Sequence, residues 1–338
     1  MPKPGDKVAV VSPSRGLPEL FPAPYELGLR RLREDFGLVP VEYPTTRRLR
    51  SSPRERAADL HAAFADPDIT AVIATIGGDD QITVLKYLDP DLLRANPKPF
   101  FGYSDNTNLL NYLHHLGLTS YHGGAVMVQF GRGGAMHPDS EASLRAALFS
   151  PGDFELTPAR AWTDVGRDWA DPANLATEPP LKPGTGWEWH HAETVVEGNL
   201  WGGCLEIIDW QLAASRWMRP VDEYDGVLFC ETSEEMPSAT AVYRMLRNAG
   251  ERGLLACFDA VLWGRPKAWE FGNPLTEDEG RRFVADQYDA VRRALAEYNP
   301  DAMLVTGLDI GHTDPQLVLP YGGWVRVDGP DRRIIVRY

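Results

Sequence analysis

The feature that most constrains the fold is a regular alternation of apolar strands and amphipathic helices over the first 150 residues. The pattern predicts strands at Lys7–Val11, Val39–Tyr43, Ala71–Ile76, Phe100–Tyr103 and Thr119–His122. It predicts helices at Tyr25–Phe36, Arg54–Ala65, Ile82–Leu88, Asn106–Leu116 and Ser140–Phe149. Strands that alternate with helices in this way are typical of a doubly wound parallel sheet.

The pattern changes after this first region. Residues 151–195 are rich in Pro, Gly, Trp and Asp and show little periodicity, so we interpret them as linker and loop. Beyond them we expect strands at Gly226–Glu231, Ala260–Trp263, Met303–Thr306, Trp324–Asp328 and Arg333–Tyr338, with helices at Gly203–Ala213, Ala239–Ala249 and Glu277–Glu297. The chain is therefore expected to form two domains, 1–150 and 196–338.

A serine lies where one predicted strand meets the next helix. The apolar residues 99–101 lead into Gly102, Tyr103 and Ser104, and the helix follows. A serine at such a sharp turn is lifted clear of the sheet, and the first helix amides point toward what it attacks. Asn106 stands where the usual nucleophile motif has its second glycine, and Ser104 could also be a simple helix N-cap.

Two further polar residues follow apolar strands in the second half. Glu231 ends the strand from Leu228, and His312 follows the strand from Val305 between glycine and threonine. A nucleophilic serine needs a base, and the base needs an acceptor that holds its ring. Open sheets tend to place chemistry just past their strand ends, so these residues suggest a Ser…Glu…His order.

Several short motifs occur together and in order along nearly the whole chain. They are Val10–Ser14, Ile76–Asp80, Gly102–Asp105, Gly198–Gly203, Leu228–Glu235 and Gly311–Thr313. In these pieces the sequence resembles the LD-carboxypeptidase family of serine peptidases, which includes the microcin C self-immunity peptidases. The run Leu228–Glu235 is more similar to the microcin-immunity branch than to the muropeptide branch.

The resemblance implies both a fold and a site. It implies a class I glutamine amidotransferase-like, parallel-sheet N-terminal domain and a mixed β/α, barrel-like C-terminal domain. The family triad carries over to Ser104, Glu231 and His312, and would lie in the cleft between the domains. The resemblance also implies a homodimer.

An oxyanion hole needs two donors close to the nucleophile. One is expected to be the backbone N–H of Asp105, which follows the serine. The other is expected from the loop Gly77-Gly78-Asp79, through Gly78, because glycine allows close backbone approach. Taken alone, the glycine pair could equally be a tight turn or a phosphate cradle. Asp79 is a further candidate substrate contact.

Composition excludes some partners and cofactors. A net charge of −14 argues against nucleic acid or an anionic membrane, since either would need a basic face. No apolar run approaches a membrane span, and the first residues lack a signal peptide's apolar core. The cysteines, Cys204, Cys230 and Cys257, have no paired spacing and suggest buried thiols in a reducing compartment. We therefore expect a cytoplasmic protein that needs no cofactor.

Other side chains could bind substrate. His190, His191 and Glu193 match no zinc spacing, so no metal site is expected. Trp187 and Trp189 could stack on a nucleobase, or could instead close a domain seam. The cations Arg132, Arg244 and Lys267 could each bind a carboxylate or phosphate, and His122 could line the cleft.

Three functions remain open from the sequence. The first is a serine carboxypeptidase or amidase of the microcin-immunity type, which cleaves an aminoacyl or peptidyl group from a nucleotide-like leaving group. The second is a cytoplasmic LD-carboxypeptidase that removes the terminal D-alanine from a murein tetrapeptide. The third is a non-catalytic protein that binds a small molecule in the same cleft. Base stacking favours the first, whereas a cationic clamp favours the second.

Overall fold

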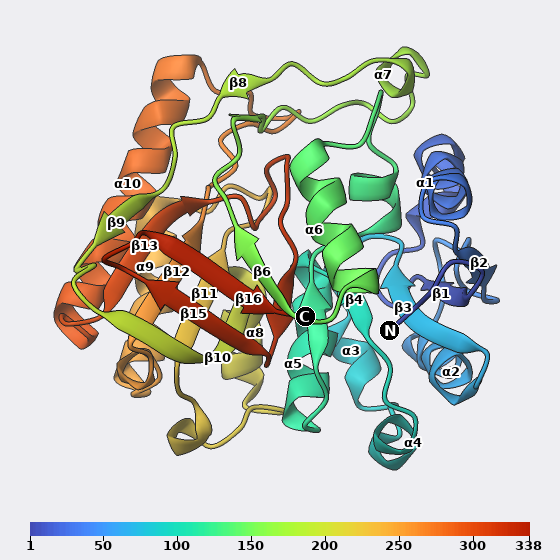
Figure 1. The fold of residues 1–338 in the computed structure, drawn as a ribbon, viewed down its shortest axis with the longest axis horizontal. Coiled ribbons are helices and arrows are strands. Elements are labelled where there is room, and N and C mark those ends of the chain that lie inside the picture. Colours follow the sequence, from blue (N-terminus) through green and yellow to red (C-terminus); the bar gives the residue numbers. More distant parts are fainter.

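The computed structural model describes residues 1–338, which form two sheets flanked by helices (Figure 1). The first sheet has the order β14-β5-β4-β3-β1-β2. Its strands are β1 (Lys7–Val11), β2 (Val39–Glu42), β3 (Ile69–Ala74), β4 (Phe100–Gly102), β5 (Ser120–His122) and β14 (Leu319–Tyr321). Strands β1 to β5 pair in parallel, and β14 is antiparallel to β5.

The second sheet is mixed and has the order β6-β16-β15-β10-β11-β12-β13-β9. Its central strands are parallel: β10 (Val195–Cys204), β11 (Val227–Glu231), β12 (Ala260–Gly264) and β13 (Met303–Leu308). The outer strands pair antiparallel: β6 (Asp153–Leu156), β9 (Glu188–His190), β15 (Trp324–Asp328) and β16 (Arg333–Arg337). A two-stranded sheet joins β7 (Ala161–Trp162) to β8 (Lys182–Pro183).

Ten α-helices cover the sheets. They are α1 (Pro22–Glu34), α2 (Pro53–Ala65), α3 (Ile82–Leu85), α4 (Pro90–Ala95), α5 (Thr107–His115), α6 (Pro138–Phe149), α7 (Ala173–Ala176), α8 (Leu205–Ala214), α9 (Ala239–Glu251) and α10 (Glu277–Tyr298). Two of them begin with a reciprocal capping box, Ser52 with Glu55 on α2 and Thr276 with Glu279 on α10. Such boxes satisfy otherwise unpaired amides and fix the first residue of a helix.

The expected fold class is confirmed: a parallel-sheet region is followed by a second, mixed α/β region. The expected strands and helices of the first region are present, with ends shifted by a few residues. The short α4 and a π-helical turn at Val126–Phe130 were not expected. Segment 151–195 is also more ordered than a linker, since β6 and β9 form the two edges of the second sheet.

The two regions share structure rather than lying side by side as separate units. Strand β14 comes from the C-terminal region yet completes the first sheet. One large apolar cluster runs from Leu110 and Leu113 on α5 to Trp201 and Phe229 in the second sheet. The indole N–H of Trp201 also donates to Asn111 Oδ1 at 2.9 Å. In Figure 1, α5 and α6 lie between the two halves, and the shared apolar cluster makes this junction a packed core.

Candidate active site

Ser104 has an unusual backbone conformation. Strand β4 ends at Gly102, and Ser104 opens a 3-10 turn that leads directly into α5. Its φ of 61° lies in the left-handed region, which costs a non-glycine residue about 1–3 kcal/mol. Strain of this kind clusters at functional sites and fits the serine turn expected from the sequence.

Gly77 lies directly against this serine. A Cβ atom at residue 77 would lie 2.9 Å from Ser104 Cβ and 3.0 Å from Ser104 Oγ. Only glycine leaves room for the serine side chain at this distance. The loop after β3 therefore forms one wall of the space around the hydroxyl.

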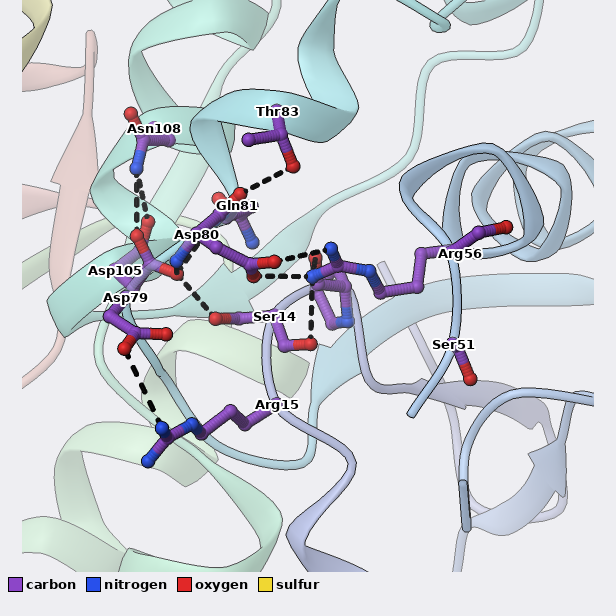
Figure 2. Close-up of polar contacts among 12 residues, drawn as sticks. Ser14, Arg15, Ser51, Arg56, Asp79, Asp80, Gln81, Thr83, Asp105 and Asn108 are labelled. Atoms are coloured by element: carbon purple, nitrogen blue, oxygen red, sulfur yellow. Dashed lines mark hydrogen bonds and ion pairs between the residues drawn. The ribbon is translucent and has the colours of Figure 1, made fainter. Parts of the chain in front are cut away.

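The Asp105 carboxylate links the loops after β1 and β3 to the start of α5 (Figure 2). One oxygen accepts from the Ser14 hydroxyl and from the N–H groups of Asp80, at 3.1 Å, and Gln81, at 2.9 Å. The other accepts from Asn108 Nδ2 at 2.9 Å. Asp105 is fully buried, and this burial raises its pKa while the hydrogen bonds partly offset the rise. The carboxylate thus holds the loops after β1 and β3 against the start of α5.

An ion pair supports this network from outside. Arg56 on α2 donates to both carboxylate oxygens of Asp80, at 2.7 and 2.8 Å, and to the Ser14 carbonyl at 2.9 Å. Arg56 is buried, whereas Asp80 is half exposed. Figure 2 also shows the neighbouring Asp79 facing Arg15, 3.5 Å away. The candidate substrate residue Asp79 therefore lies at the exposed rim of the network.

The expected oxyanion donors lie in these loops. The backbone N–H groups of Gly78 and Asp105 donate no hydrogen bond within the protein. A Cβ at residue 78 would come within 2.2 Å of Ser14 Oγ, so Gly78 is as closely packed as Gly77. Two backbone N–H groups without a partner in the protein are therefore close to the serine turn. One belongs to Asp105, which follows Ser104, and the other to Gly78, which follows the Gly77 that lies against Ser104.

Glu231 and His312 meet at the end of the second sheet. Glu231 ends β11 and is fully buried, and its Oε2 lies 2.6 Å from His312 Nδ1. The pair needs two neighbouring glycines. A Cβ at Gly264 would lie 2.7 Å from Glu231 Cβ, and one at Gly311 would lie 2.8 Å from Glu231 Oε2.

The other ring nitrogen of His312 faces a second glutamate. His312 Nε2 lies 3.0 Å from Glu234 Oε2 in an ion pair that lacks hydrogen-bond alignment. Burial alone would lower the pKa of His312, but Glu231 and Glu234 outweigh it and raise the pKa to about 10. Partial burial alone would raise the pKa of Glu234, but the imidazolium lowers it to about 2.

The serine and the histidine lie near each other but are not hydrogen bonded. The ring of Tyr103, the residue before Ser104, lies 5.0 Å from the His312 ring. Both ring nitrogens of His312 face carboxylates, so neither is bonded to Ser104 Oγ. Glu231 and His312 are therefore in direct contact, the residue before Ser104 lies against the histidine ring, and Glu234 lies at the ring nitrogen that Glu231 does not contact.

The aromatic and basic candidates are more scattered. Trp187 donates through Nε1 to Asp309 Oδ2 at 3.3 Å, and Trp189 lies on edge strand β9; both pack against the main core. Arg132 pairs with Asp314 at 2.7 Å, and Arg244 lies exposed on α9. Lys267 lies near Glu234, whose charge opposes the lowering of the lysine pKa by burial.

Other histidines have different surroundings. His122 is fully buried, with Nε2 2.9 Å from the Ile310 carbonyl oxygen, and burial lowers its pKa. No three His, Cys, Asp or Glu side chains gather in an arrangement that could hold a metal ion. No helix has the length and apolar character needed to cross a bilayer.

Sequence reasoning missed two features of this site. One is Glu234, which the spacing could have revealed because it follows Glu231 by three residues at the same strand end. The other is the Asp105 side chain, since only the backbone of that residue was expected to act. No local sequence pattern indicated this role, because the Asp105 carboxylate pairs with loops that are distant from it along the chain.

Comparison with known proteins gives the family. Residues 8–123 match the LD-carboxypeptidase N-terminal domain, and residues 197–327 match the LD-carboxypeptidase C-terminal domain. A Vibrio cholerae protein named as a carboxypeptidase is 28% identical over 325 residues, 94% of this chain and 91% of the relative. The Escherichia coli microcin C7 self-immunity protein MccF is 26% identical, over 84% of this chain and 78% of MccF.

Solved structures agree with these matches. An MccF-like protein from Streptococcus pneumoniae, solved with AMP, superposes with a TM-score of 0.85 at 26% identity, over 99% of each chain. MccF in complex with glutamyl sulfamoyl guanosine superposes with a TM-score of 0.84, over 100% of this chain and 97% of MccF, and at 24% identity it shows the shared fold. The chain is therefore a serine hydrolase that belongs to the LD-carboxypeptidase family.

Proposed function

We propose that this protein is a serine amidase that releases an aminoacyl or peptidyl group from a nucleotide-like leaving group, with Ser104, His312 and Glu231 as its triad. The observation that carries the proposal is the strained Ser104 turn beside the Glu231–His312 pair. The self-immunity relative contributes the substrate class, because its solved complexes contain aspartyl sulfamoyl adenosine and glutamyl sulfamoyl guanosine.

The reaction follows from the placement of these groups. Ser104 Oγ attacks the acyl carbonyl carbon while His312 Nε2 takes its proton, and the same nitrogen then protonates the leaving amide nitrogen. Glu231 accepts from Nδ1, which fixes the tautomer and stabilises the imidazolium. Water then attacks the acyl-enzyme by the same route and regenerates the serine.

The unpaired backbone N–H groups of Asp105 and Gly78 would donate hydrogen bonds to the oxyanion. Donors of this kind act at about 2.7–3.1 Å from the oxyanion, and losing one typically costs about 10²–10³ in turnover. The Asp105 carboxylate fixes both donors indirectly, because it binds the loop that carries Gly78 and belongs to the residue that supplies the other N–H. Protein dipoles held in place before reaction need no reorganisation when charge develops.

Substrate contacts beyond the reacting bond are part of the proposal. Lys267, near Glu234, is the cation best placed to meet a phosphate or sulfamate group. Trp187, Trp189 and Asp79 remain candidate contacts to the leaving group. A cytoplasmic homodimer is also proposed, and light scattering of the purified protein tests its mass.

The second candidate is cleavage of a murein tetrapeptide before its terminal D-alanine. A murein tetrapeptide carboxypeptidase of Pseudomonas aeruginosa is 42% identical over 78 residues, 23% of this chain. In this case Lys267 would hold the D-alanine carboxylate, as a charge-assisted pair.

Mass spectrometry of two substrates distinguishes these activities. Wild type and Ser104→Ala are incubated with aspartyl sulfamoyl adenosine and, separately, with a murein tetrapeptide ending in D-alanine. We expect cleavage of the adenosine compound only, and its loss in Ser104→Ala. Cleavage of the tetrapeptide alone would transfer the protein to cell-wall recycling, and cleavage that persists in Ser104→Ala would exclude this serine as the nucleophile.

A further inference from the structure

We propose that Glu234 recognises the positively charged amino group of the substrate's acyl part, and that this contact frees His312 Nε2 to act on Ser104. The inference rests on the proposed function, which it deepens. It begins from the position of the Glu234 carboxylate, 3.0 Å from the ring nitrogen that must receive the serine proton.

As described, the free enzyme holds its base in an inactive state. His312 is paired with a glutamate at each ring nitrogen, and an imidazolium with no free nitrogen cannot accept a proton. The two carboxylates raise the pKa of His312 and so favour the protonated ring. Catalysis therefore requires the removal of one carboxylate from the ring.

Of the two carboxylates, Glu234 is the one that can move. Glu231 is fully buried between Gly264 and Gly311 and makes a directed hydrogen bond of 2.6 Å. The Glu234 side chain is 54% exposed, and its contact with Nε2 lacks hydrogen-bond alignment. Because this carboxylate is open to solvent and its contact is not aligned, a cation brought by the substrate can reach it and compete with the ring for it.

The charges around the ring point to an ammonium group as that cation. Titratable groups that face His312 are Glu231 from β11, Glu234 from the loop after β11, Tyr103 after β4 and His122 on β5. Lys267 is close enough to Glu234 for the glutamate charge to raise the lysine pKa against the effect of burial. An aminoacyl nucleotide carries an ammonium group on the carbon next to the reacting carbonyl and an anionic linkage beyond it. Glu234 and Lys267 offer the complementary pair of charges.

The main chain under Glu234 is fixed, so a side-chain movement is sufficient. Ser233 donates through its N–H and its hydroxyl to the buried Glu206, at 2.9 and 2.7 Å. When an ammonium group draws the Glu234 carboxylate away, the Nε2 proton passes to solvent and the neutral nitrogen faces the serine. No backbone rearrangement is needed for this exchange.

The test compares aspartyl sulfamoyl adenosine with its N-acetyl derivative, which has the same bonds but no positive charge. We expect wild type to favour the free amine by about 10- to 100-fold in kcat/KM, as for hydrogen bonds between charged groups. In Glu234→Gln this preference should fall to within about threefold. Glu235→Gln removes the same charge from the next exposed residue, which makes no ion pair, and should keep the wild-type preference. An equal preference in wild type and Glu234→Gln would overturn the proposal.

A second measurement reports on the ring itself. In Ser104→Ala protein, which should not turn over, the His312 pKa is followed by NMR. We expect the pKa to fall when aspartyl sulfamoyl adenosine binds, but not when the N-acetyl derivative binds. Introducing Glu234→Gln should lower it without ligand, and Glu235→Gln should leave it unchanged. Absence of any cleavage by wild type would instead refute the proposed function, whereas an unchanged pKa in Glu234→Gln would refute the role of Glu234.

Discussion

The two halves of the site are held in different ways. Ser104 lies next to a buried network in which one carboxylate, that of Asp105, accepts from donors in three separate segments. His312 is fixed at one nitrogen by a buried glutamate and at the other by an exposed one. In the proposed mechanism, the nucleophile is therefore held in place before substrate arrives, whereas the base is held at only one ring nitrogen by a buried group. Electrostatic preorganisation matters most where charge develops, which is beside the serine.

Removing the Glu231 carboxylate, which holds one nitrogen of His312, should have the largest effect on kcat. In Glu231→Gln the side chain keeps its shape, but its amide cannot both accept from Nδ1 and stabilise the imidazolium. We expect kcat to fall by about 10⁴, as when the acid of a serine triad is neutralised. Single-turnover kinetics with aspartyl sulfamoyl adenosine measure this loss. A reduction below tenfold would show that Glu231 is not the partner of the catalytic histidine.

The serine side of this comparison was largely predictable from sequence. Strand-helix alternation indicates a parallel sheet, and a parallel sheet exposes the residues that follow its strands, which include Ser104. Glu234 is the third residue after Glu231, but which ring nitrogen of His312 it approaches depends on a side-chain conformation in a loop. Sequence patterns carry no information about the conformation of this side chain.

Pairing between strands that are distant along the chain was the other feature that the sequence did not predict. Leu319–Tyr321 completes the first sheet although about two hundred residues separate it from β5. Strands β6 and β9 also escaped prediction, because they are edge strands of only four and three residues, too short for a pattern to stand out from the loop around them. Patterns within a window of the sequence identify elements, not the partners that these elements find.

A smaller loss is expected when the wall beside Ser104 is moved. Gly77→Ala places a methyl group 2.9 Å from Ser104 Cβ and 3.0 Å from its hydroxyl, so one of the two must shift. Misplacing a reacting group by about 1 Å can cost about 10² in rate. Gly280→Ala is the matched control, since its new Cβ would lie 3.5 Å from Ala268 Cβ in ordinary contact. Steady-state kcat for the two variants provides the comparison, and equal values would mean that Gly77 does not position the nucleophile.

The smallest effect, and the most informative about preorganisation, is expected from Asp105→Asn. Here the amide nitrogen must face either Asn108 Nδ2 or the Asp80 and Gln81 N–H groups, which leaves at least one buried donor unpaired. An unpaired buried donor costs about 1–3 kcal/mol, which urea unfolding would detect. We expect kcat to fall about tenfold while KM changes little, because the oxyanion donors loosen but remain present. Asp79→Asn removes the same charge at an exposed position 3.5 Å from Arg15, and it should change neither the stability nor kcat measurably.

The contrary outcome is that Asp105→Asn lowers the stability and leaves kcat intact. The buried network would then hold the fold together without orienting the serine, and the two halves of the site would differ in stability alone.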